Sequence, residues 1–260
     1  FDDITGLLQT QRDAAWGEVA RRLAHEIKNP LTPIQLSAER MRRKYLGALP
    51  SEDAQILDRA THTIVQQVEA MKEMVNAFSD YARAPDIDIS RFDIDELAHE
   101  VVELYRAQES RVKIILTVDS GLPHLQADVG RMRQILHNLL RNSIEALEHS
   151  EDGRINVKLS EAEFHGVPMI EIVVVDNGPG FQHGTLGQVF DPYVTTKPKG
   201  TGLGLAIVKK LVEEHAGMID ADNHEDGGAA IRIRLPIDDA AREAMLAVPP
   251  GHSDRRRERA

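Results

Sequence analysis

The sequence predicts a chain of two parts, an antiparallel helical hairpin followed by a two-layer α/β sandwich. Two long stretches with helical apolar spacing predict the hairpin over residues 14–84, and alternating strands and helices predict the sandwich over residues 85–237. The length of 260 residues fits two domains, because a domain averages about 150 residues. Residues 238–260 end in a basic run and predict a disordered tail.

The composition excludes several classes of function. With 31 Lys+Arg against 42 Asp+Glu the net charge is −11, which argues against binding nucleic acid through the overall field. The absence of cysteine excludes disulfides, zinc–thiolate sites, iron–sulfur clusters and thiol nucleophiles. No apolar run approaches the roughly 18 residues of a membrane span, and no signal peptide is visible, so we expect a soluble chain. The start at Phe1 indicates a fragment of a longer protein.

The first helix is expected over residues 14–45. Pro30 and Pro33 interrupt it, and because proline lacks an N–H we expect a kink or a loosened turn just after residue 29. Its apolar residues recur at steps of three and four and are Val19, Leu23, Ile27, Leu31, Ile34, Ala38, Met41 and Tyr45.

A second amphipathic helix is expected from Ser51 to the linker Ala84-Pro85-Asp86. Two such helices cannot bury their apolar stripes alone, so the hairpin is predicted to dimerise into a four-helix bundle. The stripe of the second helix follows heptad spacing and contains Leu57, Thr61, Ile64, Val68, Met71, Val75, Phe78 and Ala82.

Helices and strands alternate in the rest of the chain. Asp93 with Glu96 resembles a capping box, and Asp128 is expected to cap a helix. The predicted helices cover residues 93–107, 128–147 and 201–215. The predicted strands cover residues 112–118, 155–159, 169–175, 218–221 and 229–235.

His25 and Asn29 are predicted to share the solvent face of the first helix. At about 100° per residue they lie roughly 200° and 240° from Leu23, opposite the apolar stripe. With Glu26 beside it, His25 is placed to meet a partner, although a solvated surface histidine fits the same pattern. A zinc site of the His-Glu-x-x-His type is disfavoured, because Asn29 stands where the second histidine belongs.

Two glycine-rich segments are candidates for nucleotide binding. Asp176-Asn177-Gly178-Pro179-Gly180 follows an apolar strand, so the carboxylate can accept a hydrogen bond from a base amino group, or the segment is an ordinary turn. Gly200-Thr201-Gly202-Leu203-Gly204 precedes a helix whose N-terminal N–H groups can hold phosphate. It completes neither a Walker A loop nor the dinucleotide fingerprint. Asn138 and Asn142 share one helix face and either hold Mg²⁺ with phosphate oxygens or form a solvated stripe.

Taken in this order, the motifs resemble the kinase core of bacterial two-component sensor histidine kinases over about residues 14–237. More narrowly, residues 15–45 look like the NtrY-type kinases of nitrogen regulation. The opening residues 1–5 are similar to the last strand of a PAS sensor domain, so residues 1–13 are expected to be the end of that domain or a linker. The matching segments are Ala24–Pro33, Asn138–Asn142, Asp176–Gly180, Phe190–Tyr193 and Thr201–Leu205.

The resemblance implies a role for each candidate residue. His25 is the acceptor of the γ-phosphoryl group of ATP, Glu26 takes or orients its proton, and Asn29 orients water for dephosphorylating a response regulator. Asn142, helped by Asn138, holds Mg²⁺. Residues 181–199 form a mobile lid anchored through Phe190. The adenine amino group is read by Asp176, the pocket wall is formed by Gly178 and Gly180, and the phosphates are bound by Thr201, Gly202, Leu203 and Gly204.

The implied protein is a homodimer that binds Mg-ATP and passes phosphate to a response regulator of the NtrX type. It is the cytoplasmic portion of an inner-membrane protein and touches the membrane only through segments missing here. Two alternatives stay open at this point. One is a degenerate scaffold that binds nucleotide without turnover, and the other is an ATPase of the gyrase, Hsp90 or mismatch-repair type, which lacks a histidine-bearing hairpin.

Overall fold

The computed structural model describes residues 2–82, 87–109, 111–182, 184–197, 200–224 and 227–247. The chain divides into two compact units, and the predicted linker Ala84–Asp86 lies outside the described residues. One unit comprises residues 1–86 with 191–207, and the other comprises residues 87–190 with 208–260.

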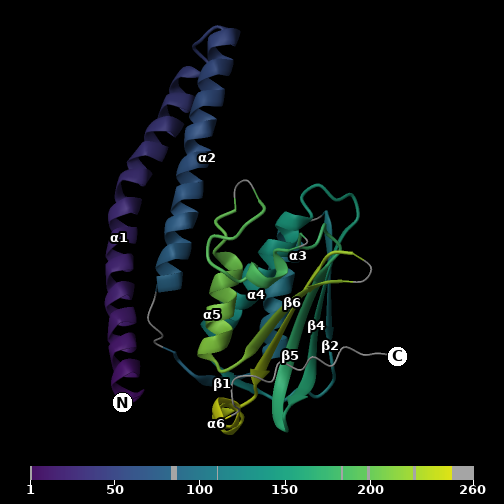
Figure 1. Ribbon diagram of the computed structural model, residues 1–260. Coiled ribbons are helices and arrows are strands. Elements are labelled where there is room, and N and C mark those ends of the chain that lie inside the picture. Colours follow the sequence, from purple (N-terminus) through teal and green to yellow (C-terminus); the bar gives the residue numbers. More distant parts are fainter. Residues whose placement is uncertain are drawn as a thin grey trace. The chain divides into compact units, whose positions relative to one another are not determined.

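The first unit contains a hairpin of two long helices, α1 (Asp2–Tyr45) and α2 (Ser51–Ala82), which lie side by side (Figure 1). α1 runs through Pro30 and Pro33 without a break, so the loosened turn expected after residue 29 does not end the helix. The hydroxyl of Ser37 donates to the Pro33 carbonyl at 2.7 Å, which engages a backbone oxygen within the same helix. α1 packs against α2, and this tertiary contact favours a continuous helix over an interrupted one.

The strand expected at residues 1–5 is wrong where the structure describes that segment, because Asp2–Thr5 lie in α1. A strand needs a neighbouring strand to pair its N–H and C=O groups, whereas a helix pairs them within its own segment. None of the strands in the described part of the chain pairs with this segment, so the helix provides the hydrogen bonds of its backbone N–H and C=O groups.

The apolar stripes of both helices divide into two faces. Residues seven apart are buried inside the hairpin, namely Ala24, Leu31 and Ala38 on α1 and Thr61, Val68 and Val75 on α2. Their apolar neighbours Leu23, Ile27, Ile34, Met41, Ile64 and Met71 stay between 38% and 46% exposed. The hairpin therefore buries Ala24, which the predicted stripe omits, together with part of each predicted stripe, and it leaves these six larger residues, the open half-stripe, exposed in the single chain.

The second unit contains a sheet that includes β2, β4, β5 and β6 (Figure 1). It has five strands in the order β2-β4-β5-β7-β6, in which β2 and β4 are parallel and the other pairs are antiparallel. The prediction of a two-layer α/β sandwich is confirmed. Even-numbered residues of β5 from Ile170 to Asp176 are buried and Glu171, Val173 and Val175 are half-buried, so one face of the sheet is covered more completely. The strands are β2 (Val112–Val118), β4 (Gly153–Phe164), β5 (Val167–Asp176), β6 (Met218–Asn223) and β7 (Ala229–Pro236).

Helices α3 (Ile94–Gln108), α4 (Val129–Ala146) and α5 (Gly204–Glu214) supply the helical elements of the sandwich. Asp128 caps α4 as predicted, since its side chain accepts the Arg131 N–H at 3.0 Å. Asp93 precedes α3 but makes no cap hydrogen bond, because its carboxylate contacts His124 instead. The predicted capping box is therefore absent.

Three short elements were not expected. β1 (Ser90–Phe92) and β3 (Leu125–Ala127) form a separate two-stranded sheet, and η1 (Leu186–Gln188) is a short 3-10 turn. Part of the predicted tail is helical, since α6 covers Asp239–Ala247. Its Ala241 is buried and its Arg242 donates to the Gln126 carbonyl at 2.7 Å, which explains why this segment is ordered. None of the helices in the described part of the chain combines the length and apolar character needed to cross a bilayer.

Candidate functional site

Asp176 ends β5 with its carboxylate almost fully buried, at 6% exposure. Oδ1 accepts the Gly178 N–H at 2.9 Å and the Ala229 N–H at 3.3 Å, and Oδ2 accepts the Ser143 hydroxyl at 3.1 Å. Donors from β5's own turn, from β7 and from α4 thus fix the orientation of the carboxylate. Such a group can act only as an acceptor while it is ionised, which suits recognition of an amino group.

Asn177 ties the turn after Asp176 to the start of β4. Its Oδ1 accepts the Arg154 N–H at 2.6 Å, and its Nδ2 donates to the Asp152 carbonyl at 2.8 Å. Gly178 is required next, because a Cβ there would lie 2.9 Å from Oδ1 of Asp176. The alternative that Asp176–Gly180 is an ordinary turn therefore does not account for the buried carboxylate of Asp176.

Sequence reasoning missed three residues that build this region: Ser143, Gly228 and Asn223. A Cβ on Gly228 would fall 1.8 Å from the carbonyl oxygen of Asp176, so the chain just before β7 approaches the Asp176 backbone only through a glycine. The Gly227-Gly228 pair between two predicted strands was the available signal, since paired glycines between strands mark close backbone contact.

Asn138 and Asn142 both lie on α4 but in different environments. Asn138 is 8% exposed, its Nδ2 donates to the Gln134 carbonyl at 3.0 Å, and its Oδ1 accepts from Arg141 at 3.3 Å. Asn142 is half-exposed and adjoins Ser143, the partner of Asp176. Asn138 is thus the more buried of the two amides on the predicted face, and Asn142 lies nearer to the surface.

Among the described residues no group of three or more His, Cys, Asp or Glu side chains forms a metal cluster. A cation at α4 would accordingly depend on amide oxygens together with oxygens of a ligand. Mg²⁺ is commonly held in this way, by few protein ligands plus phosphate and water.

The segment before α5 is shaped by glycines and by a hydroxyl. Gly202 has φ +66°, and a Cβ there would lie 2.6 Å from the carbonyl carbon of Tyr193, whose N–H donates to the Gly202 carbonyl at 3.0 Å. Thr201 Oγ1 accepts the Leu203 N–H at 3.3 Å, and Leu203 is fully buried. α5 then begins at Gly204, whose N–H, like the next two, has no carbonyl one turn back within the helix.

Phe190 is half-buried and follows Val189, which is 7% exposed. Other parts of the protein therefore cover the Val189 side chain and part of the Phe190 side chain.

His25, Glu26 and Asn29 are exposed on α1, as their spacing predicts. Glu26 is directed along the helix toward Arg22, whose Nε lies 3.1 Å from its Oε1. Residues four apart on a helix lie on the same face. His25 and Asn29 consequently share the accessible face, and Glu26 pairs with the preceding turn.

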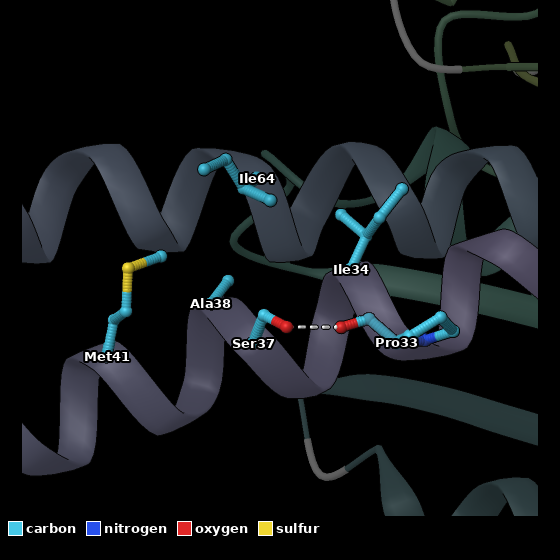
Figure 2. Close-up of a pocket in the computed structure, with 6 residues that line it drawn as sticks. All are labelled: Pro33, Ile34, Ser37, Ala38, Met41 and Ile64. Carbon is cyan, nitrogen blue, oxygen red and sulfur yellow. Dashed lines mark hydrogen bonds between the residues drawn. The ribbon is translucent and has the colours of Figure 1, made fainter.

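An apolar groove lies between the helices of the hairpin on the face that stays open. Figure 2 shows Ile34 and Met41 of α1 and Ile64 of α2 around this groove, with Pro33, Ser37 and Ala38 completing the lining. The three larger side chains belong to the half-stripe that the single chain does not bury.

His215 joins the C-terminal end of α5 to the start of α4. It is 2% exposed, its Nδ1 lies 2.7 Å from the Leu211 carbonyl, and its Nε2 accepts the Asp128 N–H at 3.2 Å. Both contacts are satisfied by the neutral ring with its proton on Nδ1. Burial lowers the pKa of His215 below its ordinary value, because the charged imidazolium is poorly solvated there.

This lowered pKa predicts a loss of stability on acidification. The unfolded chain takes up the proton more readily than the folded chain, so the contribution of His215 is complete above the ordinary histidine pKa of about 6.5 and declines as pH falls through the folded value. Glutamine offers N–H donors and a carbonyl acceptor and does not titrate. Denaturant unfolding at pH 7.5 and 5.5 should therefore show a larger loss of free energy of unfolding in the wild type than in His215→Gln. Equal losses would contradict this role.

Two family models match the chain. The His Kinase A (phospho-acceptor) domain matches residues 15–86, and the histidine kinase-, DNA gyrase B- and HSP90-like ATPase matches residues 127–239.

Two curated relatives match most of this chain. Nitrogen regulation protein NtrY of Azorhizobium caulinodans is 42% identical over 241 residues, covering 90% of this chain and 30% of the relative. A putative NtrY-like sensor histidine kinase of Rickettsia typhi is 36% identical, covering 89% of this chain and 38% of the relative. The chain thus spans 30% to 38% of the length of these relatives.

Solved structures show the same architecture. Full-length ShkA in complex with AMPPNP aligns with a TM-score of 0.66 at 28% identity, covering 84% of this chain and 45% of that one. Histidine kinase ThkA in complex with response regulator protein TrrA aligns with a TM-score of 0.60 at 25% identity, covering 88% of this chain and 64% of that one.

Proposed function

Since this chain belongs to the two-component sensor histidine kinases of the NtrY type, we propose that it phosphorylates its own His25 from Mg-ATP and passes the phosphoryl group to an aspartate of a response regulator. The observation that carries the proposal is the presence in one chain of an exposed histidine in a phospho-acceptor hairpin and a buried, oriented carboxylate in an ATPase fold. An ATPase of the gyrase or Hsp90 type does not require the exposed histidine of the hairpin. A degenerate scaffold without turnover does not require the histidine together with the buried carboxylate.

In the proposed site Asp176 accepts a hydrogen bond from the adenine amino group at Oδ2. Ser143 already donates to this oxygen, and Oδ1 is engaged by two backbone N–H groups. A carboxylate oxygen accepts two hydrogen bonds, so Oδ2 can serve the hydroxyl and the base together. The N–H groups at the start of α5, with Thr201 and Gly202 before them, are suited to bind phosphate, because a helix N-terminus attracts anions.

In the transfer step a ring nitrogen of neutral His25 attacks the γ-phosphorus. A P–N bond forms while the bond from phosphorus to the β,γ-bridging oxygen breaks, and ADP leaves with that electron pair. Glu26 takes the ring proton. It must first leave Arg22, and an exposed ion pair of this kind is worth no more than about 1 kcal/mol. An oxygen of the regulator's carboxylate then forms a bond to the same phosphorus while the P–N bond breaks, the electron pair of that bond stays on the ring nitrogen, and Glu26 returns the proton to the ring.

Mg²⁺ fits the donor set of α4. Asn142, helped by Asn138, would hold it by amide oxygens, with the remaining ligands coming from phosphate and water. When bound, the ion neutralises charge on the phosphates. Asn142 is the main protein ligand in this proposal, and Asn138, whose Oδ1 also accepts from Arg141, assists it.

The proposed function is tested by incubating the chain with Mg²⁺ and ATP labelled at either the α- or the γ-phosphorus. We expect acid-labile label on the protein from γ-labelled ATP alone. Label from both positions, or from neither, would contradict the proposal.

The open apolar half-stripe of the hairpin supports a homodimer, in which a second copy covers it and completes a four-helix bundle. Ile34→Glu places a charge in this face on both protomers. Burial of one such side chain contributes about 1.5–3 kcal/mol, so the dissociation constant should rise at least about 100-fold. Light scattering after gel filtration measures the mass. Leu36→Glu is the matched control, since Leu36 is 57% exposed on the opposite side of α1 and should leave the dimer intact.

Asn29 supports a second activity, dephosphorylation of the regulator, because its amide lies on the accessible face beside His25. A positioned polar group of this kind contributes roughly 100-fold to water attack. Asn29→Ala should slow regulator dephosphorylation by about that factor while autophosphorylation persists, and Asn29→Thr should retain much of the activity. Unchanged dephosphorylation in Asn29→Ala would refute this role.

The remaining assignments follow from the family. Residues 181–199 act as a lid over the nucleotide, anchored through Phe190, and Leu203 holds the phosphate-binding segment in place by its burial. The functional modules are residues 14–84 and 85–237, in keeping with the family matches. The regulator is of the NtrX type, and the chain is the cytoplasmic part of a longer inner-membrane protein.

A further inference from the structure

Asn223, the last residue of β6, holds the backbone of Phe181 with both atoms of its amide. Oδ1 accepts the Phe181 N–H at 2.6 Å, and Nδ2 donates to the Phe181 carbonyl at 3.0 Å. In an antiparallel sheet, the two residues of a hydrogen-bonded pair exchange two such bonds through their backbones. In this contact the Asn223 side chain takes the place of one of the two backbones. Phe181 follows the Asp176–Gly180 turn directly, at the point where the lid begins.

Gly180 leaves the space that this clamp requires. Its φ is +71°, and a Cβ there would lie 2.7 Å from Oδ1 of Asn223 and 3.1 Å from the carbonyl oxygen of Gly228. The second glycine of the motif is therefore needed for the Asn223 side chain as well as for its own backbone conformation.

The end of β6 that presents Asn223 is itself tied to the start of β7. The His224 N–H donates to the Gly228 carbonyl at 3.0 Å, and the next residue, Ala229, donates its N–H to Oδ1 of Asp176. One connection between strands thus holds both the base-binding carboxylate and the first residue of the lid.

We propose that Asn223 is a positioning residue that sets the direction in which the lid leaves the base-binding pocket. The proposal rests on the proposed function, because the lid matters only if the pocket binds ATP. Asn223 acts through the backbone of Phe181. Its removal frees the start of the lid, lowers the population of the closed state and weakens ATP binding, while transfer to His25 from bound ATP stays unaffected.

The test compares Asn223→Ala and Asn223→Asp with the wild type and with Asp220→Ala, a control at an exposed position on the same strand. Two hydrogen bonds of about 1 kcal/mol each predict a KM for ATP that is about 5- to 30-fold higher in Asn223→Ala. The maximal rate of self-labelling should stay within about twofold. Asn223→Asp keeps the acceptor and loses the donor, so its KM should fall between the two.

Hydrogen exchange at single amides separates positioning from a general loss of structure. The Phe181 amide should exchange faster in Asn223→Ala and stay protected in Asn223→Asp, while the Gly178 and Ala229 amides stay protected in both variants. A wild-type chain that binds no ATP would overturn the proposed function and the lid role with it. A wild type that binds ATP, matched by Asn223→Ala in KM and in Phe181 exchange, would overturn the positioning role alone.

Discussion

Replacing His25 by glutamine should abolish the acid-labile label that the chain acquires from γ-labelled ATP. Glutamine has a similar size but its amide nitrogen is not a nucleophile, whereas an imidazole ring nitrogen is. His25 is exposed on α1, so the substitution removes no buried contact and the hairpin should stay folded. The expected loss is complete to the background of the assay, and nucleotide binding should be unchanged.

His62→Gln is the matched control. His62 is exposed on α2 of the same hairpin, and its replacement should leave labelling at the wild-type level. Retention of acid-labile label in His25→Gln would refute His25 as the acceptor. Loss of label in both variants would point to damage to the hairpin instead.

Replacing Asp176 by asparagine should weaken ATP binding by roughly 10- to 150-fold, the range of a hydrogen bond to a charged group worth about 1.5–3 kcal/mol. The amide oxygen can keep the two backbone N–H groups now at Oδ1, which places the NH₂ group where Oδ2 accepts from Ser143. The serine hydroxyl can rotate and accept from this NH₂ group. An adenine amino group cannot, because donor would then face donor.

The same geometry predicts a change of base preference in Asp176→Asn. An NH₂ group at this position can donate to the carbonyl oxygen of guanine, so the ratio of GTP to ATP affinity should rise. Ser143→Ala is the control, because it removes one donor and leaves the acceptor facing the base intact. Calorimetric titration measures both nucleotides. Unchanged affinity and unchanged preference in a folded Asp176→Asn would contradict the assignment.

Elements with strong local signals were predictable from the sequence. The strand at Val112–Val118 has the same bounds in the structure, and Asp128 caps α4, because alternating apolar residues and an N-cap carboxylate act within a few residues. The strands β1 and β3 have three residues each, too few for a period to be visible. The charged composition of the C-terminal segment masked α6, which depends on contacts with residues more than 100 positions away, such as Gln126.

The sequence could not predict which apolar residues of each helix are buried within the hairpin and which stay exposed. Apolar spacing at steps of three and four is the same for both sets. Ala38 and Ile34 belong to one sequence pattern, yet pairing with α2 buries the first and leaves the second open. The candidate site shows the same limit. Asp176 and the glycines stand out as motifs, whereas the hydrogen-bond partners Ser143 and Asn223 lie 33 and 42 positions from the residues they hold.

The central claim is that His25 receives the γ-phosphoryl group of ATP. It is tested most directly by phosphorylating the chain with Mg-ATP, digesting it at neutral to basic pH and locating the phosphoryl group by fragmentation of the peptides in a mass spectrometer. We predict one modified peptide, with the phosphoryl group on the imidazole of His25. A phosphoryl group on another residue, or a chain that consumes ATP and stays unmodified, would contradict the account.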